Sequence, residues 1–271
     1  MTTNILFTQP IFAPDTKRLE RNLNSILSLK ENYDYMIDGI YMGGYAREDW
    51  MWEKIYEVTK DIPNCIITKY NTNYGKAYVI NDLVKKATEK NTYHFMLTAD
   101  SDILFLQPNK FMIPRLLECV ERTIEKKHKP FGVVALNQQG YNCNMIPECS
   151  QNTFEYTNIF GQKERVLWNN APAYIAGGCL FTSIDAWKKV NGYRIMGVYA
   201  GDEAYYLQDM SRIGHTWQLI ETIHVEHPHE NDLEYAQWKG KVCQRDSTGK
   251  VKNDISKQIQ EAEEFWRKRC Q

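Results

Sequence analysis

The chain has 271 residues, of which 43% are hydrophobic and 13% aromatic, enough for one large α/β domain or two small ones. Its formal net charge of −1 demands no polyanionic partner, and no apolar stretch approaches the roughly 20 residues of a membrane span. The N-terminus lacks the regions of a signal peptide, and the seven cysteines form no paired framework. These absences predict a cytoplasmic protein with reduced thiols.

The first hundred residues alternate between strand and helix patterns. Strands are predicted over 4–10, which Pro10 closes, over 35–42, which Gly43-Gly44 closes, over 65–70, and in the apolar run before Asp100. Helices are predicted from a cap at Asp15 or Thr16 to about residue 30, over 50–60, and after a turn at 71–76. Such alternation is typical of a parallel sheet with helices on its faces.

The second half continues this pattern, with a looser middle. Helices are predicted over 111–127, 183–190, from 201–203 to 213, and over 253–269, and strands over 131–136 and 217–225. Residues 137–170 lack a firm period and are interpreted as loops or an edge hairpin. No repeat or linker divides the chain, so a single domain over 1–271 is predicted.

The segment YHFMLTADSDILFL, residues 93–106, is the centre of the functional prediction. It is predicted as a buried strand that ends in Asp100-Ser101-Asp102, and ligands of open α/β sheets gather at that end of the strands. Residues two apart in an extended chain project to the same side, so Asp100 and Asp102 can converge on one point. Two carboxylates suit Mg²⁺ or Mn²⁺ holding a diphosphate, although a surface turn or a helix cap would use the same residues.

Two stretches of the second half carry further candidates. Gly177-Gly178 interrupts the apolar run 174–181, which indicates either close backbone approach to a ligand or a β-bulge. Gly201-Asp202-Glu203 opens a helix, where free backbone N–H groups keep a carboxylate ionised, as a general base for an acceptor hydroxyl must be. Asp202 can equally be the helix cap, so the function is assigned in preference to Glu203.

Three of the six histidines lie within 223–229, after the last predicted strand. His227 is best placed to point from the end of that strand, where a neutral imidazole could complete a metal site begun by the two aspartates. The alternative is a structural role, and the choice among His224, His227 and His229 stays open.

The turn at 71–76 stands at a predicted helix N-terminus. Backbone N–H groups and Lys76 at such a position suit an anion. An ordinary strand-to-helix loop would have the same appearance, so the turn alone identifies no ligand.

The order of these features resembles the GT-A fold glycosyltransferases, and most closely the family 2 type. The resemblance covers residues 4–229 and is carried by Asn73-x-Gly75-Lys76 with Asn81, Asp100-Ser101-Asp102, Gly177-Gly178 through Phe181, Asn191-Gly192-Tyr193, Gly201-Asp202-Glu203 with Arg212 and Gly214, and His227. It implies an α/β fold of GT-A type, a single Rossmann-like, open, mostly parallel sheet with helices on both faces. Residues 1–106 would form the nucleotide-sugar-binding half, 107–240 the acceptor half, and 253–270 a C-terminal helix.

The resemblance also implies a sugar transferase that uses a nucleotide-sugar donor, expected to be a UDP-sugar, with Mn²⁺ or Mg²⁺. Asp100 would lie near the ribose and the metal, and Asp102 and His227 would be metal ligands. Lys76 would help bind the diphosphate, within the donor-binding loop that contains Asn73. Glu203, or less favourably Asp202, would be the catalytic base. The backbone at Gly177 and Gly178 would border the donor sugar.

The chain departs from the family pattern in three places. The family has an acidic residue at the end of its second strand that contacts the nucleotide base, and the candidate here, Asp38, leaves the identity of the base open. The acidic pair reads Asp202-Glu203 where Glu-Asp is commoner in the family, so the assignment of the catalytic base is open between these two neighbours. The stretch 10–14 after the first strand is also unusual.

The sequence therefore predicts direct displacement with one inversion, although the same fold hosts retaining enzymes. The expected acceptor is a saccharide or glycoconjugate; a nucleic acid with a hydroxylated base is the minority alternative, suggested by the basic clusters 126–129 and 267–269. A nucleotidyltransferase is the main rival, but residues 4–17 lack its glycine-rich, basic phosphate loop. The intact carboxylates and His227 disfavour a second rival, a non-catalytic sugar-nucleotide-binding protein.

Overall fold

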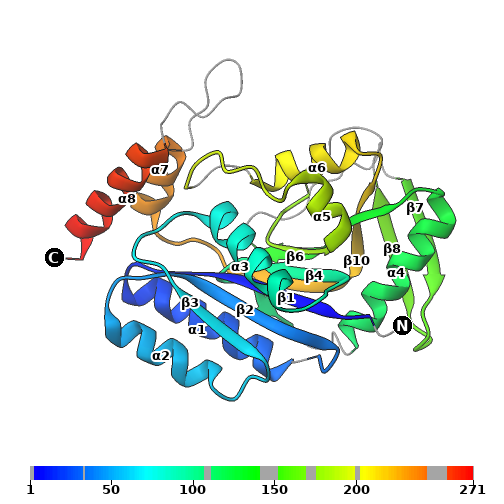
Figure 1. The fold of residues 1–271 in the computed structure, drawn as a ribbon, viewed down its shortest axis with the longest axis horizontal. Helices are drawn as coiled ribbons and strands as arrows, with labels where there is room; N and C mark the ends of the chain where they lie inside the picture. The colour runs from blue at the N-terminus through cyan, green and yellow to red at the C-terminus, as the bar shows by residue number, and fades with distance from the viewer. Residues whose placement is uncertain are drawn as a thin grey trace.

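The computed structural model describes residues 3–32, 34–106, 111–140, 152–168, 175–198, 202–242 and 255–270. Its centre is one mixed sheet (Figure 1). The strands are β1 Ile5–Ala13, β2 Ile37–Ala46, β3 Cys65–Lys69, β4 Phe95–Ala99, β5 Leu104–Phe105, β6 Phe131–Gly140, β7 Asn152–Thr157, β8 Lys163–Trp168, β9 Cys179–Ser183 and β10 Thr216–His227. The helices are α1 Thr16–Glu31, α2 Asp49–Thr59, α3 Lys76–Lys90, α4 Met112–Lys127, α5 Ile184–Val190, α6 Asp202–Arg212, α7 Leu233–Val242 and α8 Ile255–Arg269.

The strand order is β3-β2-β1-β4-β9-β6-β10-β8-β7, and β5 pairs with the end of β10. β3, β2, β1 and β4 are parallel neighbours, and β6 is parallel to β10. β9 runs antiparallel between β4 and β6, and its first residue, Cys179, pairs with Ala99 at the end of β4. The predicted open, mostly parallel sheet is confirmed. The reversal of β9 brings residues 175–178 to the edge where β4 ends.

The sheet is packed on both faces. α1, α2 and α4 share one buried core with the sheet, which includes Leu19, Ile55 and Leu116. α3, α5 and α6 share the other, which includes Leu83 and Tyr206. Figure 1 shows α1 and α2 on the opposite side of the sheet from α3 and α5. In the described part of the chain, every helix is too short or too polar to cross a membrane.

The first strand is longer than the sequence predicted, because Pro10 does not end it. β1 pairs with β2 from Ile5 to Ala13, but its pairing with β4 ends at Thr8. Proline cannot donate a hydrogen bond to a neighbouring strand. Pro10 lies where the pairing with β4 has already ended, so the missing N–H is tolerated and β1 continues to Ala13.

The second strand likewise runs past its predicted end at Gly43-Gly44 and reaches Ala46. A Cβ added at Gly43 would lie 2.7 Å from the backbone oxygen of Thr68, and one at Gly44 would lie 1.9 Å from that of Ile11. These glycines therefore allow close approach of neighbouring strands instead of turning the chain.

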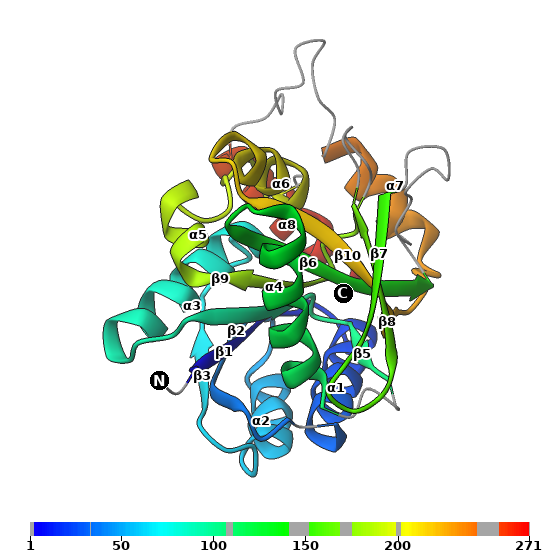
Figure 2. The ribbon, with the colours of Figure 1, turned by 90° about the vertical axis from the view of Figure 1, so that its right-hand side faces the viewer.

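The predicted edge hairpin is present, although 141–151 and 169–170 lie outside the described residues. β7 and β8 pair antiparallel at the edge of the sheet (Figure 2). Arg115 on α4 lies 2.5 and 3.0 Å from the two carboxylate oxygens of Glu164 on β8. Both side chains are buried, at 5% and 0% exposure. This ion pair ties the hairpin to α4.

Two helices follow β10. α8 agrees with its predicted amphipathic pattern, whereas α7 was not predicted, because its apolar residues form no regular stripe. The rings of Trp238 on α7 and Phe265 on α8 stack at 4.4 Å between centroids, and Trp266 meets Phe12 at 5.7 Å. The two helices therefore pack on each other and against the end of β1.

Candidate functional site

Asp100 directly follows β4 and meets the segment that leads into β9. Its backbone N–H donates to the carbonyl of Gly178 at 2.7 Å, and its own carbonyl accepts from the Gln9 side chain at 2.9 Å. Lys76, the first residue of α3, places Nζ 2.6 Å from Asp100 Oδ1 and 2.9 Å from the Gly177 carbonyl oxygen. The structure therefore brings together Asp100, Lys76, Gly177 and Gly178, four of the residues that the sequence singled out.

Lys76 is held as a cation. Burial lowers the pKa of its ammonium, but the negative charge of Asp100, with smaller contributions from Tyr193 and Glu203, raises that pKa well above its ordinary value. The Lys76 side chain is 19% exposed. A fixed cation at a helix N-terminus suits an anionic group such as a diphosphate.

Asp102 lies between a histidine and an arginine. Its Oδ1 is 3.2 Å from His227 Nε2, and its Oδ2 accepts from Arg21 Nη2 at 2.5 Å. On the other side of the imidazole, Nδ1 of His227 lies 3.0 Å from Gln138 Nε2. The Gln138 amide thus holds Nδ1, and Nε2 faces Asp102.

The same contacts shift both pKa values. Burial raises the pKa of Asp102, but the hydrogen bond and charge of His227, together with Arg21, bring it below its ordinary value. Burial lowers the pKa of His227, but the hydrogen bond and charge of Asp102 raise it above its ordinary value. Asp102 is therefore a carboxylate at neutral pH.

Asp102 and His227 fit a divalent ion as a pair of ligands. Neighbouring ligands of an octahedral ion, each about 2.1 Å from it, lie about 3 Å apart. That spacing is close to the 3.2 Å between Asp102 Oδ1 and His227 Nε2. The Oδ1 of Asp100 is instead paired with Lys76. Among the described residues, no three His, Cys, Asp or Glu side chains are arranged as a complete metal site.

His227 is the histidine of the cluster that meets Asp102. His224 instead places its Nδ1 3.1 Å from Gln139 Nε2, and His229 is exposed. The alternation of β10 accounts for this choice, because Ile223, Val225 and His227 lie on one buried face of the strand.

Glu203 lies against Gly177, near the start of α6. A Cβ added to Gly177 would lie 2.4 Å from Cβ of Glu203 and 2.9 Å from its Cδ. A Cβ added to Gly178 would lie 2.1 Å from Gln138 Oε1. The close approach predicted at the two glycines is therefore an approach of protein side chains, one of them the candidate base. The side chain of Asp202 lies outside the described residues.

The turn before α3 is held by its own side chain. Asn73 Oδ1 accepts from the backbone N–H of Gly75 at 3.1 Å. Gly75 has a φ of 83°, a conformation that favours glycine, and a Cβ there would lie 2.6 Å from the Val198 backbone oxygen. Asn73 thus shapes the loop that presents Lys76.

The position of Asp38 does not support a contact with a nucleotide base. Asp38 is the second residue of β2, and its Oδ2 accepts from the backbone N–H of Ile5 at 2.6 Å. It lies at the amino end of the parallel strands, whereas Gly44 and Tyr45, near the other end of β2, line the cavity. β2 ends at Ala46, beyond its expected end at Met42, so Asp38 lies far from the end of the strand.

The candidate residues surround one cavity of about 450 Å³. Its wall includes Asn73, Lys76, Asp100, Asp102, Glu203 and His227. It also includes residues that the sequence did not single out: Arg18, Arg21, Tyr45, Glu230, Tyr235 and Lys239. Basic residues three apart on a helix, such as Arg18 and Arg21, have the same pattern as a solvated face. Only the position of α1 beside Asp102 identifies them.

No protein-family model and no curated protein matches the chain. Solved structures do. GalNAc-T7 with UDP, GalNAc and Mn²⁺ has a TM-score of 0.60 and 11% identity, over 86% of this chain and 45% of that one. S. aureus TarS 1–349 has a TM-score of 0.57 and 11% identity, over 83% and 60%. Mannosyltransferase PcManGT from Pyrobaculum calidifontis, with GDP-Man and Mn²⁺, has 0.56 and 12%, over 86% and 59%.

These similarities identify the fold of the chain. The chain has the GT-A fold of glycosyltransferases, as the resemblance in sequence predicted. It spans between 45% and 60% of the lengths of these three solved chains, which therefore contain much that has no counterpart here.

Proposed function

We propose that the protein transfers a sugar from a nucleotide-sugar donor to an acceptor hydroxyl with the help of a divalent metal ion. One observation carries the proposal: a fixed cation at Lys76, an ion-ligand pair at Asp102 and His227, and a carboxylate at Glu203 line the same cavity. The complexes of similar fold with UDP and Mn²⁺ and with GDP-Man and Mn²⁺ support such a donor and ion.

In this proposal the residues at the carboxyl edge hold the donor. Asp102 and His227 would hold the ion, with Asp100 close to it and to the donor ribose, and a bound ion would supply Lewis-acid stabilisation of the diphosphate. Lys76 adds positive charge for the same diphosphate. The backbone at Gly177-Gly178 borders the sugar.

Glu203 is the proposed general base. Its carboxylate lies against Gly177 and lines the cavity, so it stands beside the place assigned to the donor sugar. It would take the proton of the attacking acceptor hydroxyl and give a single inversion at the sugar. Asp202, one residue earlier, is the alternative base.

The proposal includes a UDP-sugar as donor, a saccharide or glycoconjugate as acceptor, and a family 2-type division into donor half 1–106 and acceptor half 107–240. The basic clusters offer no specific support for a nucleic acid. Burial and the charge of Lys129 lower the pKa of Lys127 to about 7, and its Nζ lies 3.7 Å from the Trp168 ring centroid. Arg269 is paired with Asp232 and Glu234.

A panel of UDP-, GDP- and other nucleotide-sugars, incubated with and without Mn²⁺, tests the proposal. We expect one donor to be hydrolysed slowly in the presence of Mn²⁺, and EDTA to abolish this reaction. The winning donor is then supplied with saccharide acceptors, and the anomer of the product is read by NMR. A chain that neither binds nor hydrolyses any donor contradicts the proposal. In a parallel assay that supplies a nucleoside triphosphate and a sugar 1-phosphate instead, pyrophosphate release would indicate nucleotidyl transfer.

A further inference from the structure

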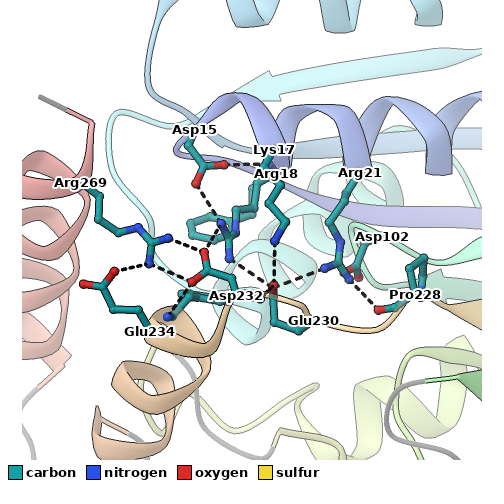
Figure 3. Close-up of polar contacts among 12 residues, drawn as sticks. Asp15, Lys17, Arg18, Arg21, Asp102, Pro228, Glu230, Asp232, Glu234 and Arg269 are labelled. Carbon is teal, nitrogen blue, oxygen red and sulfur yellow. Dashed lines mark hydrogen bonds and ion pairs between the residues drawn. The ribbon is translucent and has the colours of Figure 1, made fainter.

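Arg21, on α1, contacts both chain segments that carry the proposed ion ligands (Figure 3). Its Nη2 donates to Asp102 Oδ2 at 2.5 Å and to the carbonyl oxygen of Pro228 at 2.8 Å. Its Nη1 lies 3.4 Å from Glu230 Oε2. Pro228 directly follows His227, so one guanidinium joins the turn after β4 to the end of β10.

These contacts leave the ion-facing atoms clear of the arginine. Arg21 takes Oδ2 of Asp102, whereas Oδ1 faces His227 Nε2 at 3.2 Å. The Arg21 side chain is 14% exposed. Glu230 is itself held by Arg18 at 3.2 Å, so the arginine is anchored at both ends of its fork.

We propose that Arg21 is a positioning residue that sets the separation of Asp102 and His227 and so preorganises the two ion ligands. The inference rests on the proposed function, since it concerns the same ion. A planar guanidinium can bond two segments at once, whereas a lysine ammonium is a single point charge on a different stem. Arg21→Lys therefore keeps the charge beside Asp102 and removes the bridge.

Arg21 has one alternative role, which is to oppose ion binding. As a cation beside Asp102, Arg21 could take the place of the ion and oppose its binding. The two roles predict opposite changes in ion affinity. Because Arg21→Lys keeps the positive charge, a loss of affinity in this variant reports the lost geometry.

The test titrates Mn²⁺ alone into the full chain and follows free Mn²⁺ by electron paramagnetic resonance, without donor or turnover. We expect Arg21→Lys to bind Mn²⁺ about 10- to 100-fold more weakly than the wild type, the usual effect of losing an outer-shell partner. The control is Arg47→Lys, because Arg47 donates to the carbonyl of Trp266 at 3.0 Å and lies 3.4 Å from Glu48, so its contacts are with other residues than the ion ligands. Unchanged or tighter binding by Arg21→Lys overturns the proposal.

A second measurement needs no metal. Amide hydrogen exchange over residues 229–236 should be faster in metal-free Arg21→Lys than in the wild type and in Arg47→Lys, because Pro228 and Glu230 lose their anchor. Unchanged exchange would show that Arg21 does not hold this segment, and would overturn the proposal. A wild-type chain that binds no Mn²⁺ contradicts the proposed function, whereas equal binding by wild type and Arg21→Lys contradicts only the role of Arg21.

Discussion

At the scale of single residues, Glu203 tests the proposed chemistry most directly. Glu203→Gln keeps the shape of the side chain but removes the base, so we expect the transfer rate to fall about 10²- to 10⁴-fold. Donor binding, measured by calorimetry with Mn²⁺ present, should be nearly unchanged. Asp202→Asn is the matched comparison. A wild-type rate in Glu203→Gln would show that the base is elsewhere, and a larger loss in Asp202→Asn would move the assignment by one position.

Gly177 tests the setting of that carboxylate. In Gly177→Ala the new methyl would lie 2.4 Å from Cβ of Glu203, so the glutamate must shift. We expect transfer to fall strongly while the chain remains folded by circular dichroism. Gly161→Ala is the control: it has φ of 77° with no atom within 4 Å of an added Cβ, so it should lower stability by about 1–2 kcal/mol without affecting transfer. Full activity in Gly177→Ala would contradict the packing.

The sequence was informative for residues whose position follows from the pattern of the strand that carries them. Alternation along a strand made His227 the best placed of three histidines, although it left the choice among them open, and the apolar run 95–97 placed Asp100 at the end of a strand. Arg21 could not be found in this way, because its value depends on two segments that meet only in the folded chain. The distance of Asp38 from the cavity likewise could not be found from the sequence, since it depended on where β2 ends.

At the scale of elements, the buried ion pair of Arg115 and Glu164 helps to join α4 to the β7–β8 hairpin, beside a hydrogen bond from the Ile159 backbone N–H to Glu118 Oε2 at 2.9 Å. Burial raises the pKa of Glu164, but the hydrogen bonds and charge of Arg115, with Thr222 and Asn158, lower it below its ordinary value. A group with a lower pKa in the folded state stabilises the fold above its unfolded pKa. This contribution is lost as the pH falls through the folded pKa.

Glu164→Gln should therefore destabilise the protein by about 3–5 kcal/mol at neutral pH, because the buried Arg115 loses its counter-charge. The difference from the wild type should shrink on acidification. Urea unfolding at neutral and acidic pH measures both. Glu155→Gln, in the same hairpin but 62% exposed and 3.8 Å from Arg165, should cost only about 0–1 kcal/mol. Equal effects of the two substitutions would contradict the role of the buried pair.

The elements that the sequence misjudged share a cause. Proline and glycine usually end strands. At Pro10 the strand continues because no neighbouring strand needs the missing N–H, and at Gly43 and Gly44 it continues because the neighbouring strands leave no room for a side chain. Both strands consequently run on to the cavity. α7 has no regular apolar stripe, so its position is set by contact with α8 and α1 instead of by its own pattern.

At the scale of the whole molecule, α7 lines one side of the cavity, and a buried arginine on α1 contacts both α7 and α8. The Arg18 guanidinium lies 4.3 Å from the ring centroid of Tyr235 and 5.0 Å from that of Trp266. It also lies 2.9 Å from Asp232 Oδ2, which Arg269 on α8 contacts at 2.5 Å (Figure 3). Tyr235 and Lys239, on α7, line the cavity. Docking of α7 and α8 therefore shapes the proposed donor site.

Trp266→Ala should undock α8. Trp266 is 3% exposed, and its loss should cost about 3–5 kcal/mol, as is usual for a buried aromatic residue. Donor affinity should fall with it, because α7 loses the helix against which it packs. Denaturant unfolding and calorimetry measure the two effects. Trp50→Ala, which removes a 40% exposed ring on α2, should change neither strongly. If Trp266→Ala is destabilised but binds the donor as tightly as the wild type, docking of α8 does not shape the donor site.

The direction of β9 has a consequence for how such a protein can diversify. Its pairing with β4 is fixed from Cys179 to Ser183, so the chain that enters it can change length or composition without altering the register of Asp100. The two glycines must stay, because Glu203 and Gln138 fill the space beside them. Variation in the chain that precedes the two glycines would thus leave the proposed ion ligands in place.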